Sequence, residues 1–160
     1  MTKPDSLAQQ VYTELGPMEE TTVMCNILLL EDEALIAVEV ERTIADAQLG
    51  LATCLASCAE ALTWLETNTP DVAVVDIFLR DGECDAVAEV LVARGVPLVI
   101  HTARRSASTD NHRIFLNGVW ICKPSDPDEL ISAVQSCLMG HRFAAAQLPG
   151  QDIYVPTLRL

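Results

Sequence analysis

The chain has 160 residues, of which 50% are hydrophobic and 4% are aromatic, so we expect one domain with an aliphatic core. Ten basic residues against 23 acidic ones give a net charge of −13. Direct binding to nucleic acid is therefore not expected, because it needs clustered lysine and arginine. The N-terminus lacks the pattern of a signal peptide, and no apolar run approaches the roughly 20 residues of a membrane span. We expect a cytoplasmic protein without membrane insertion.

Short apolar runs alternate with segments of helical spacing along the chain. Asp32 is placed to cap the first helix, and Ser57 and Glu60 form a capping box for the second. Asp126 is placed to cap the last helix, which begins with Pro127. The expected strands are 26–30, 51–57, 72–75, 96–101 and 119–122, and the expected helices are 33–47, 58–67, 83–94, 106–117 and 127–139.

This alternation predicts a parallel sheet with helices on both faces. The apolar runs 27–30, 72–75 and 96–100 are continuous, as is typical of strands covered on both faces. In such sheets, ligands bind beyond the carboxyl ends of the strands. Functional residues are therefore expected where each strand ends.

Polar side chains gather at these strand ends. Glu31 and Asp32 follow the first strand, and Asp76 follows the third. Thr102 follows the fourth strand, and Lys123 follows the fifth. Taken singly, each residue is explained as well or better as a helix cap, a turn residue or a solvated side chain. Their joint occurrence at one edge of the sheet is much harder to attribute to chance.

Three carboxylates at one edge must be neutralised, since each pair at about 4 Å costs roughly 4 kcal/mol at an effective dielectric constant near 20. Lys123 supplies one positive charge. A set of oxygen ligands with open positions favours Mg²⁺, or Mn²⁺ as a substitute. Mg²⁺ commonly shares the phosphate of a substrate, and an aspartate such as Asp76 can act as a phosphoryl acceptor. The pattern therefore points to phosphoryl transfer.

The motifs "LLLEDE", "VVDIFLRDG", "VIHTA" and "ICKP" occur in this order between residues 28 and 124. In this set and spacing, the sequence resembles the response-regulator receiver (CheY-like) domain of two-component signalling, of the stand-alone, single-domain type. The resemblance covers about residues 25–139. It implies a flavodoxin-like (βα)5 three-layer α/β sandwich with a five-stranded parallel sheet of order 2-1-3-4-5. An extension, 1–24, and a tail, 140–160, flank this domain.

The resemblance also implies roles for individual residues. Asp76 matches the phospho-acceptor, and Asp32 and Asp76 match direct ligands of the metal ion. Glu31 would act on the metal through water, and the backbone carbonyl of Phe78 would be a further ligand. The side chain of Phe78 stands at a position that influences water access to the phosphoryl group.

Three further residues match the switch and the lysine of the family. Thr102 matches the switch hydroxyl, Trp120 the switch aromatic residue, and Lys123 the lysine that contacts the phosphoryl group. Trp120 is larger than the usual tyrosine or phenylalanine. Ser125 departs from the phenylalanine that many members carry after the Lys-Pro pair.

The resemblance implies a phosphoprotein of a phosphorelay. A histidine kinase or a histidine phosphotransfer protein would phosphorylate Asp76, and a surface that includes the weak helix 106–117 would then bind a downstream protein. A homodimer would use the fourth helix, fifth strand and fifth helix. The tail is too short for a DNA-binding output domain, and "SLAQQVYTEL" in the extension has helical spacing. No enzymatic activity is expected beyond self-phosphorylation and autodephosphorylation.

Two other classes stay open. A pseudo-receiver would bind proteins without being phosphorylated, but such domains usually lack the aspartate or the lysine, and Asp76 and Lys123 are both present. A Mg-dependent hydrolase of the aspartyl-phosphate type usually carries a D-x-D motif, which "DIFLRD" does not supply. The six cysteines show neither C-x-x-C nor zinc-type spacing, and we expect buried thiols. They are Cys25, Cys54, Cys58, Cys84, Cys122 and Cys137.

Overall fold

The structure is a computed structural model and describes residues 24–103 and 110–146. The predicted helix in the N-terminal extension and most of the tail lie outside the described residues. The elements, in chain order, are β1 (Asn26–Leu30), α1 (Ala34–Asp46), β2 (Leu51–Leu55), α2 (Cys58–Leu65), β3 (Val72–Val75), β4 (Phe78–Leu79), β5 (Gly82–Glu83), α3 (Asp85–Ala93), β6 (Leu98–Thr102), the 3-10 helix η1 (Asp110–Asn117), β7 (Val119–Cys122) and α4 (Pro127–Ala146).

The main sheet has five parallel strands in the order β2-β1-β3-β6-β7. Numbered along the chain without the short hairpin, this is 2-1-3-4-5, and the predicted fold class is confirmed. The order reverses between β1 and β3, so their carboxyl ends flank the switch point where open α/β sheets bind ligands.

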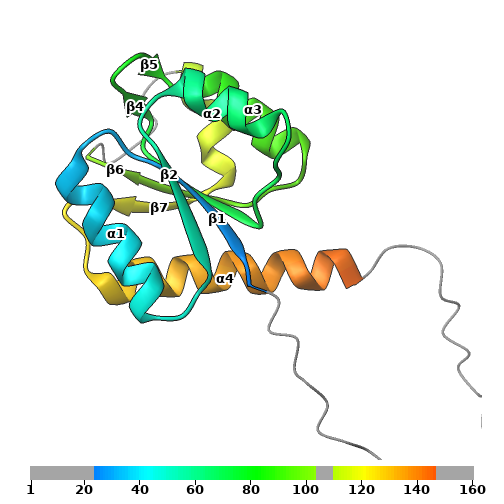
Figure 1. The fold of residues 1–160 in the computed structure, drawn as a ribbon. Coiled ribbons are helices and arrows are strands. Elements are labelled where there is room, and N and C mark those ends of the chain that lie inside the picture. Colours follow the sequence, from blue (N-terminus) through cyan, green and yellow to red (C-terminus); the bar gives the residue numbers. More distant parts are fainter. Residues whose placement is uncertain (1–23, 104–109, 147–160) are drawn as a thin grey trace, which may run out of the picture.

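Helices cover both faces of this sheet (Figure 1). Helices α1 and α4 lie on one face, and α2, α3 and η1 lie on the other. The alternation of side chains along β1 shows why both faces need cover. Leu28 and Leu30 belong to the core beneath α2 and α3, whereas Ile27 and Leu29 belong to the core beneath α1 and α4. The strand Val72–Val75 is fully buried, as its continuous apolar run predicts.

Two predicted helices differ from those observed. The fourth is a 3-10 helix over Asp110–Asn117 rather than an α-helix, and the predicted start at 106 lies outside the described residues. The last helix runs on to Ala146, past the predicted end at Met139. Gly140 costs only about 1 kcal/mol inside a helix, and the alanines that follow favour continuation.

The predicted caps were right at two helices and wrong at one. Ser57 Oγ accepts a hydrogen bond from Glu60 N at 3.2 Å, and Asp126 Oδ1 accepts one from Asp128 N at 2.8 Å. Asp32 does not cap α1, whose N-cap is Glu33 and has no side-chain cap. Asp32 instead lies exposed in the loop between β1 and α1.

A short antiparallel hairpin, β4–β5, was not predicted. It lies between Asp76 and α3 and sits beside α2 (Figure 1). The turn brings Gly82 to a φ of 130°, a backbone conformation that favours glycine. The hairpin thus shapes the loop that follows the candidate phospho-acceptor.

The six cysteines carry free thiols. Cys25 and Cys84 are buried as predicted, while the other four are only partly buried. In the described part of the chain, every helix is too short or too polar to cross a bilayer.

Candidate functional site

The predicted site residues lie just past the ends of neighbouring strands, and backbone hydrogen bonds fix them there. Asp76 N donates to Leu30 O at 3.0 Å, which extends the pairing of β3 with β1 by one residue. Lys123 N donates to Thr102 O at 2.9 Å, which does the same for β7 and β6. The backbone positions of Asp76 and Lys123 are therefore set by the sheet itself.

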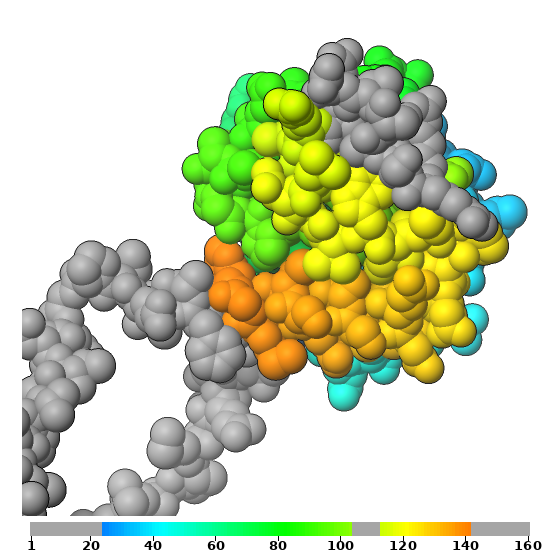
Figure 2. Space-filling view, turned by 180° about the vertical axis from the view of Figure 1, so that it is seen from behind, coloured from blue at the N-terminus to red at the C-terminus, as the bar shows by residue number. Residues whose placement is uncertain are grey.

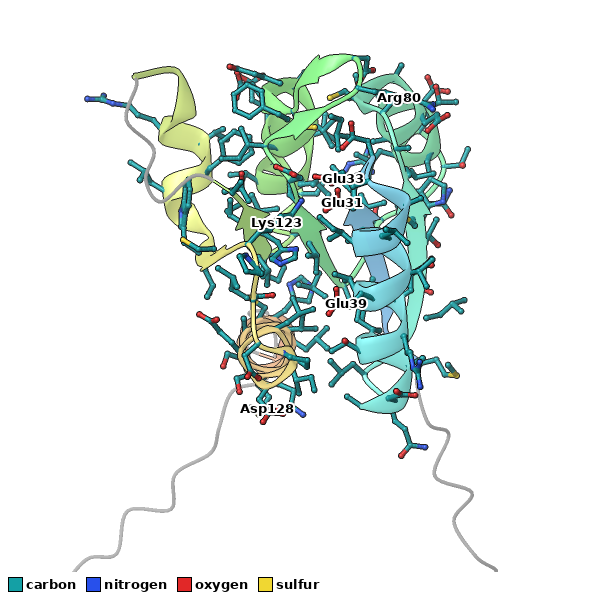
Figure 3. The ribbon with its side chains drawn as sticks, turned by 90° about the vertical axis from the view of Figure 1, so that its left-hand side faces the viewer. Glu31, Glu33, Glu39, Arg80, Lys123 and Asp128 are labelled. Atoms are coloured by element: carbon teal, nitrogen blue, oxygen red, sulfur yellow. The ribbon has the colours of Figure 1, made fainter. Side chains whose placement is uncertain are left out.

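Lys123 joins two of the predicted carboxylates. Its Nζ donates to Asp76 Oδ2 at 2.6 Å and to Glu31 Oε2. The three side chains are 8%, 13% and 1% exposed for Lys123, Asp76 and Glu31, so the charges meet almost out of water. Figure 3 shows Glu31 and Lys123 close together at this edge of the sheet, with Asp128 far from them at the start of α4. The two ion pairs of Lys123 join residues that follow β1, β3 and β7.

Burial and pairing act in opposite directions on these groups. Burial favours the neutral amine of Lys123, but the hydrogen bonds to Asp76 and Glu31 outweigh it and raise the pKa of Lys123. Burial raises the pKa of Glu31, and the hydrogen bonds from Lys123 and from Glu33 N oppose this effect. Lys123 therefore stays positively charged and holds two carboxylates that would otherwise repel one another.

The other carboxylate oxygens accept backbone hydrogen bonds. Glu31 Oε1 accepts from Glu33 N at 3.1 Å, which holds the side chain against the start of α1. Asp76 Oδ1 accepts from Phe78 N at 3.3 Å, a long bond for an N–H donor. The orientation of Asp76 is thus set by Lys123 on one side and by its own loop on the other.

The remaining predicted residues are placed around this ion pair with less contact. Thr102 is buried at the end of β6, and its backbone bonds Lys123. Phe78 lies in β4, opposite Glu83 of the hairpin. Trp120 is half-buried in β7 and donates from its indole Nε1 to Phe115 O at 3.0 Å. Asp32 is exposed beside the site but is not joined to Lys123.

The donor set fits Mg²⁺ or Mn²⁺ in kind, because all the predicted ligands are carboxylate or carbonyl oxygens. Within residues 24–103 and 110–146, however, no three or more His, Cys, Asp or Glu side chains are grouped closely enough to hold a metal ion. Lys123 instead engages one oxygen each of Glu31 and Asp76. The predicted metal ligands therefore stay a prediction.

A polar pair that was not predicted lies next to the site. His101 is buried beside Thr102, and its Nε2 shares a hydrogen bond of 2.9 Å with Ser125 Oγ. Burial, together with the nearby Lys123, lowers the pKa of His101 to about 4, so the imidazole is neutral at physiological pH. The sequence held one sign of this pair, because Ser125 is a polar residue at a position where many receiver domains carry phenylalanine. The hydrogen bond ties the end of β6 to the Lys-Pro turn.

Comparison with curated proteins finds response regulators. The chain is 26% identical over 136 residues to the response regulator UvrY of Escherichia coli, covering 80% of this chain and 61% of UvrY. It is 29% identical over 133 residues to the heme response regulator HssR of Staphylococcus haemolyticus, covering 81% of this chain and 56% of HssR. The chain thus spans about three fifths of the length of these relatives. No model of a protein family matches it.

Comparison with solved structures finds receiver domains. A CheY-like receiver domain protein from Methanospirillum hungatei superposes with a TM-score of 0.67 at 21% identity, covering 76% of this chain and 98% of that domain. The receiver domain of a sensor histidine kinase from Pseudomonas aeruginosa, which has a magnesium ion in its active-site cleft, gives 0.62 at 21% identity, with coverage of 72% and 98%. The sequence relatives of the chain are thus response regulators, and its fold is that of CheY-like receiver domains.

Proposed function

We propose that this receiver domain accepts a phosphoryl group on Asp76 and thereby changes a protein-binding surface. The observation that carries the proposal is the bond from Lys123 Nζ to Asp76 Oδ2 at the switch point of the sheet. A buried ammonium on the acceptor carboxylate is well placed to stabilise charge that develops during phosphoryl transfer. Receiver domains are generally signalling modules rather than enzymes, and we assign no other catalytic activity to the chain.

In the proposed reaction, a carboxylate oxygen of Asp76 attacks the phosphorus of a phosphohistidine or of a small acyl phosphate. The new P–O bond forms as the bond to the donor breaks, and the donor leaves with the electron pair. Lys123 contacts the transferred oxygens while remaining bonded to Glu31. The phosphorus in such a donor is already activated for transfer. Asp76 therefore needs only to be ionised and correctly oriented.

Asp32, Asp76 and the carbonyl of Phe78 are the groups that would hold Mg²⁺, or Mn²⁺, with Glu31 acting through water. A bound divalent ion would supply positive charge at the phosphoryl oxygens. The exposed position of Asp32 leaves it accessible to a hydrated ion, which suits the tendency of Mg²⁺ to keep several waters.

The proposed switch uses Thr102 and Trp120. The phosphorylated aspartate carries about −1.5 to −2 charges in place of −1, by analogy with other phosphorylated side chains. Thr102 would bond the new oxygens and draw in the backbone that follows β6. Trp120 would then exchange its bond to Phe115 O for a position nearer the site, and η1 would move with it.

The surface altered by this change would include η1, β7 and α4. Figure 2 shows these segments side by side, with α4 in orange and the η1–β7 segment in yellow. Leu116, Val119 and Met139 are exposed on them, at 61%, 42% and 57%. We propose this face for a downstream protein or a second copy of the chain. Receiver domains interact with histidine kinases or phosphotransfer proteins, and either would serve as phosphodonor here.

The direct test is phosphorylation of the purified chain with acetyl phosphate and Mg²⁺, followed by intact mass. Wild type is expected to gain one phosphoryl group, and Asp76→Asn is expected to gain none. Removal of the divalent ion with a chelator is expected to abolish labelling. Equal labelling of Asp76→Asn would overturn the assignment, and the absence of labelling in wild type would favour the pseudo-receiver.

A further inference from the structure

Two cysteines next to the β4–β5 hairpin bring their sulfur atoms together. Cys58 is the first residue of α2, and Cys84 precedes α3. Their Sγ atoms lie 2.9 Å apart, although 26 positions separate them in the sequence. A disulfide bond is about 2.05 Å long, so an approach of less than about 1 Å would allow the bond to form.

Other contacts hold the two cysteines in place. The carboxylate of Asp81, in the β4–β5 turn, accepts hydrogen bonds from Cys58 N at 2.8 Å and from Ala59 N at 3.0 Å. It thereby caps α2 from a distant part of the chain. Arg80 pairs with Glu60 of α2 at 2.6 Å. We call this set of contacts, from the hairpin turn to the first turn of α2, the hairpin clasp.

The backbone around Cys84 is fixed as well. Cys84 N donates to Ile77 O at 2.9 Å, which closes the base of the hairpin one residue after Asp76. The thiol of Cys58 lies 3.5 Å from Glu83 O. The sulfur of Cys58 and the backbone of Cys84 are therefore each held by a backbone contact of the hairpin.

The two thiols differ in access. Cys84 is fully buried, whereas Cys58 is partly exposed. Burial raises the pKa of both thiols, and Asp81 adds to the effect at Cys58. Because the thiolate is the reactive form, these pKa shifts predict thiols that react slowly with oxidants. A small oxidant would reach Cys58 first.

We propose that Cys58 and Cys84 are a redox pair that a hydroperoxide converts to a disulfide, which fastens the hairpin after Asp76 to α2. In the first step, the Cys58 sulfur attacks one peroxide oxygen, the O–O bond breaks, and Cys58 becomes a sulfenic acid as water or alcohol leaves. In the second, Cys84 attacks the Cys58 sulfur, the S–O bond breaks, and water leaves. Two thiols lose two hydrogens and two electrons, and the peroxide is reduced. Intracellular disulfides of this kind are typically transient and redox-sensing.

The test is to expose the reduced full-length chain to hydrogen peroxide and to record its intact mass and its unreduced peptide map. The expected product has lost two hydrogens and contains a cross-link between the peptides of Cys58 and Cys84, and dithiothreitol restores the starting mass. Oxygen added at Cys58 without a cross-link would overturn the proposal. So would an unchanged mass, or cross-links that involve other cysteines while this pair stays reduced.

Three variants make the test specific. Cys58→Ser is expected to lose the cross-link, and because Cys58 is partly exposed this variant avoids the cavity that a change at Cys84 would create. Cys54→Ser, at another partly buried cysteine, is the matched control and should form the cross-link at the wild-type rate. Asp81→Asn keeps an acceptor for the first turn of α2 and removes the negative charge that helps to raise the pKa of Cys58, so the cross-link should form faster than in wild type.

A second readout follows the hairpin itself. Arg80 is exposed, and trypsin can cleave after it only when the hairpin opens locally. Cleavage is expected to be slower in the oxidised chain than in the reduced chain, and equal rates would contradict the fastening of the hairpin. Asp76→Asn should form the disulfide as wild type does. Because this variant lacks the proposed phospho-acceptor but keeps both cysteines, a failure of phosphorylation can be distinguished from a failure of cross-linking.

Discussion

Asp76 lies between two regions that are held in different ways. On one side, the hairpin clasp ties the β4–β5 turn to α2 through the Asp81 cap and the Arg80–Glu60 ion pair. On the other side, η1 is a 3-10 helix, whose hydrogen bonds are poorer in geometry than those of an α-helix. We therefore expect the hairpin side of the site to stay fixed and the η1 side to move when Asp76 is phosphorylated.

The movable side nevertheless has one firm anchor. Phe115 of η1 is fully buried in the core beneath α2 and α3, and its carbonyl accepts the bond from Trp120. Lys123 stands between the two regions, since it bonds Asp76 and follows β7 directly. Substitutions that remove the supports of each region, or the lysine between them, test this contrast.

The largest effect is expected for Phe115→Ala, which removes the anchor of η1. Deletion of a buried phenylalanine side chain costs about 3–5 kcal/mol, and the loss should appear as a lower free energy of unfolding in urea. Leu116→Ala is the control, because Leu116 is 61% exposed and should change stability by no more than about 0.5 kcal/mol. Equal losses in both variants would show that η1 is not anchored as described.

Lys123→Met should cost about 3 kcal/mol at neutral pH, because it leaves Glu31 and Asp76 close together without their shared cation. Acid should reduce the loss, since burial raises the pKa of Glu31 and the protonated form no longer repels Asp76. Denaturant unfolding of wild type and Lys123→Met at several pH values measures this loss in the free energy of unfolding. A Lys123→Met loss that is the same in acid would argue against the buried carboxylate pair.

We also expect Lys123→Ala to be phosphorylated weakly but to fail in output.

His101 should make stability depend on pH in mild acid. Its folded pKa is lowered to about 4 from 6.5, so the unfolded chain binds the proton more readily between these values. The contribution to stability is full above pH 6.5 and is lost as the pH falls towards 4, by roughly 2–3 kcal/mol. The free energy of unfolding of wild type and of His101→Gln, measured across this pH range, isolates the contribution of His101. The same acid loss in both proteins would assign the effect to other groups.

The smallest effect is expected on the fixed side. Ser57→Ala removes one of the two side-chain caps of α2 and leaves the Asp81 cap, which should cost about 1 kcal/mol in the free energy of unfolding. Ser136→Ala, at an exposed position of α4, is the control and should stay within about 0.5 kcal/mol of wild type. A fixed frame should tolerate Ser57→Ala without a change in phosphorylation at Asp76. A marked change would indicate that α2 also moves with the switch.

The sequence predicted the sheet and the positions of Glu31, Asp76 and Lys123, because buried parallel strands leave a clear signal and end where polar residues begin. It did not predict the hairpin or the contact between Cys58 and Cys84. The strands of the hairpin have only 2 residues each, too few for a recognisable alternation. The two cysteines are 26 positions apart, and no local periodicity encodes their contact.

Local rules also failed where a residue has competing uses. Asp32 fits a helix cap by position, yet the helix begins one residue later, at a Glu33 cap without a side-chain bond. The segment of η1 is polar and gives only a weak helical pattern, and it forms a 3-10 helix that packs against α3. The roles of the site residues, those of Asp76 and Lys123 included, stay predictions.

The central claim is that Asp76 is the residue that carries the phosphoryl group. After incubation with acetyl phosphate and Mg²⁺, borohydride reduces an acyl phosphate of aspartate to homoserine, and the modified peptide can be sequenced by mass spectrometry. The account predicts homoserine at position 76 alone, dependent on the phosphodonor and lost when the divalent ion is chelated. Homoserine at Asp32 or at another carboxylate, with residue 76 unchanged, would contradict it.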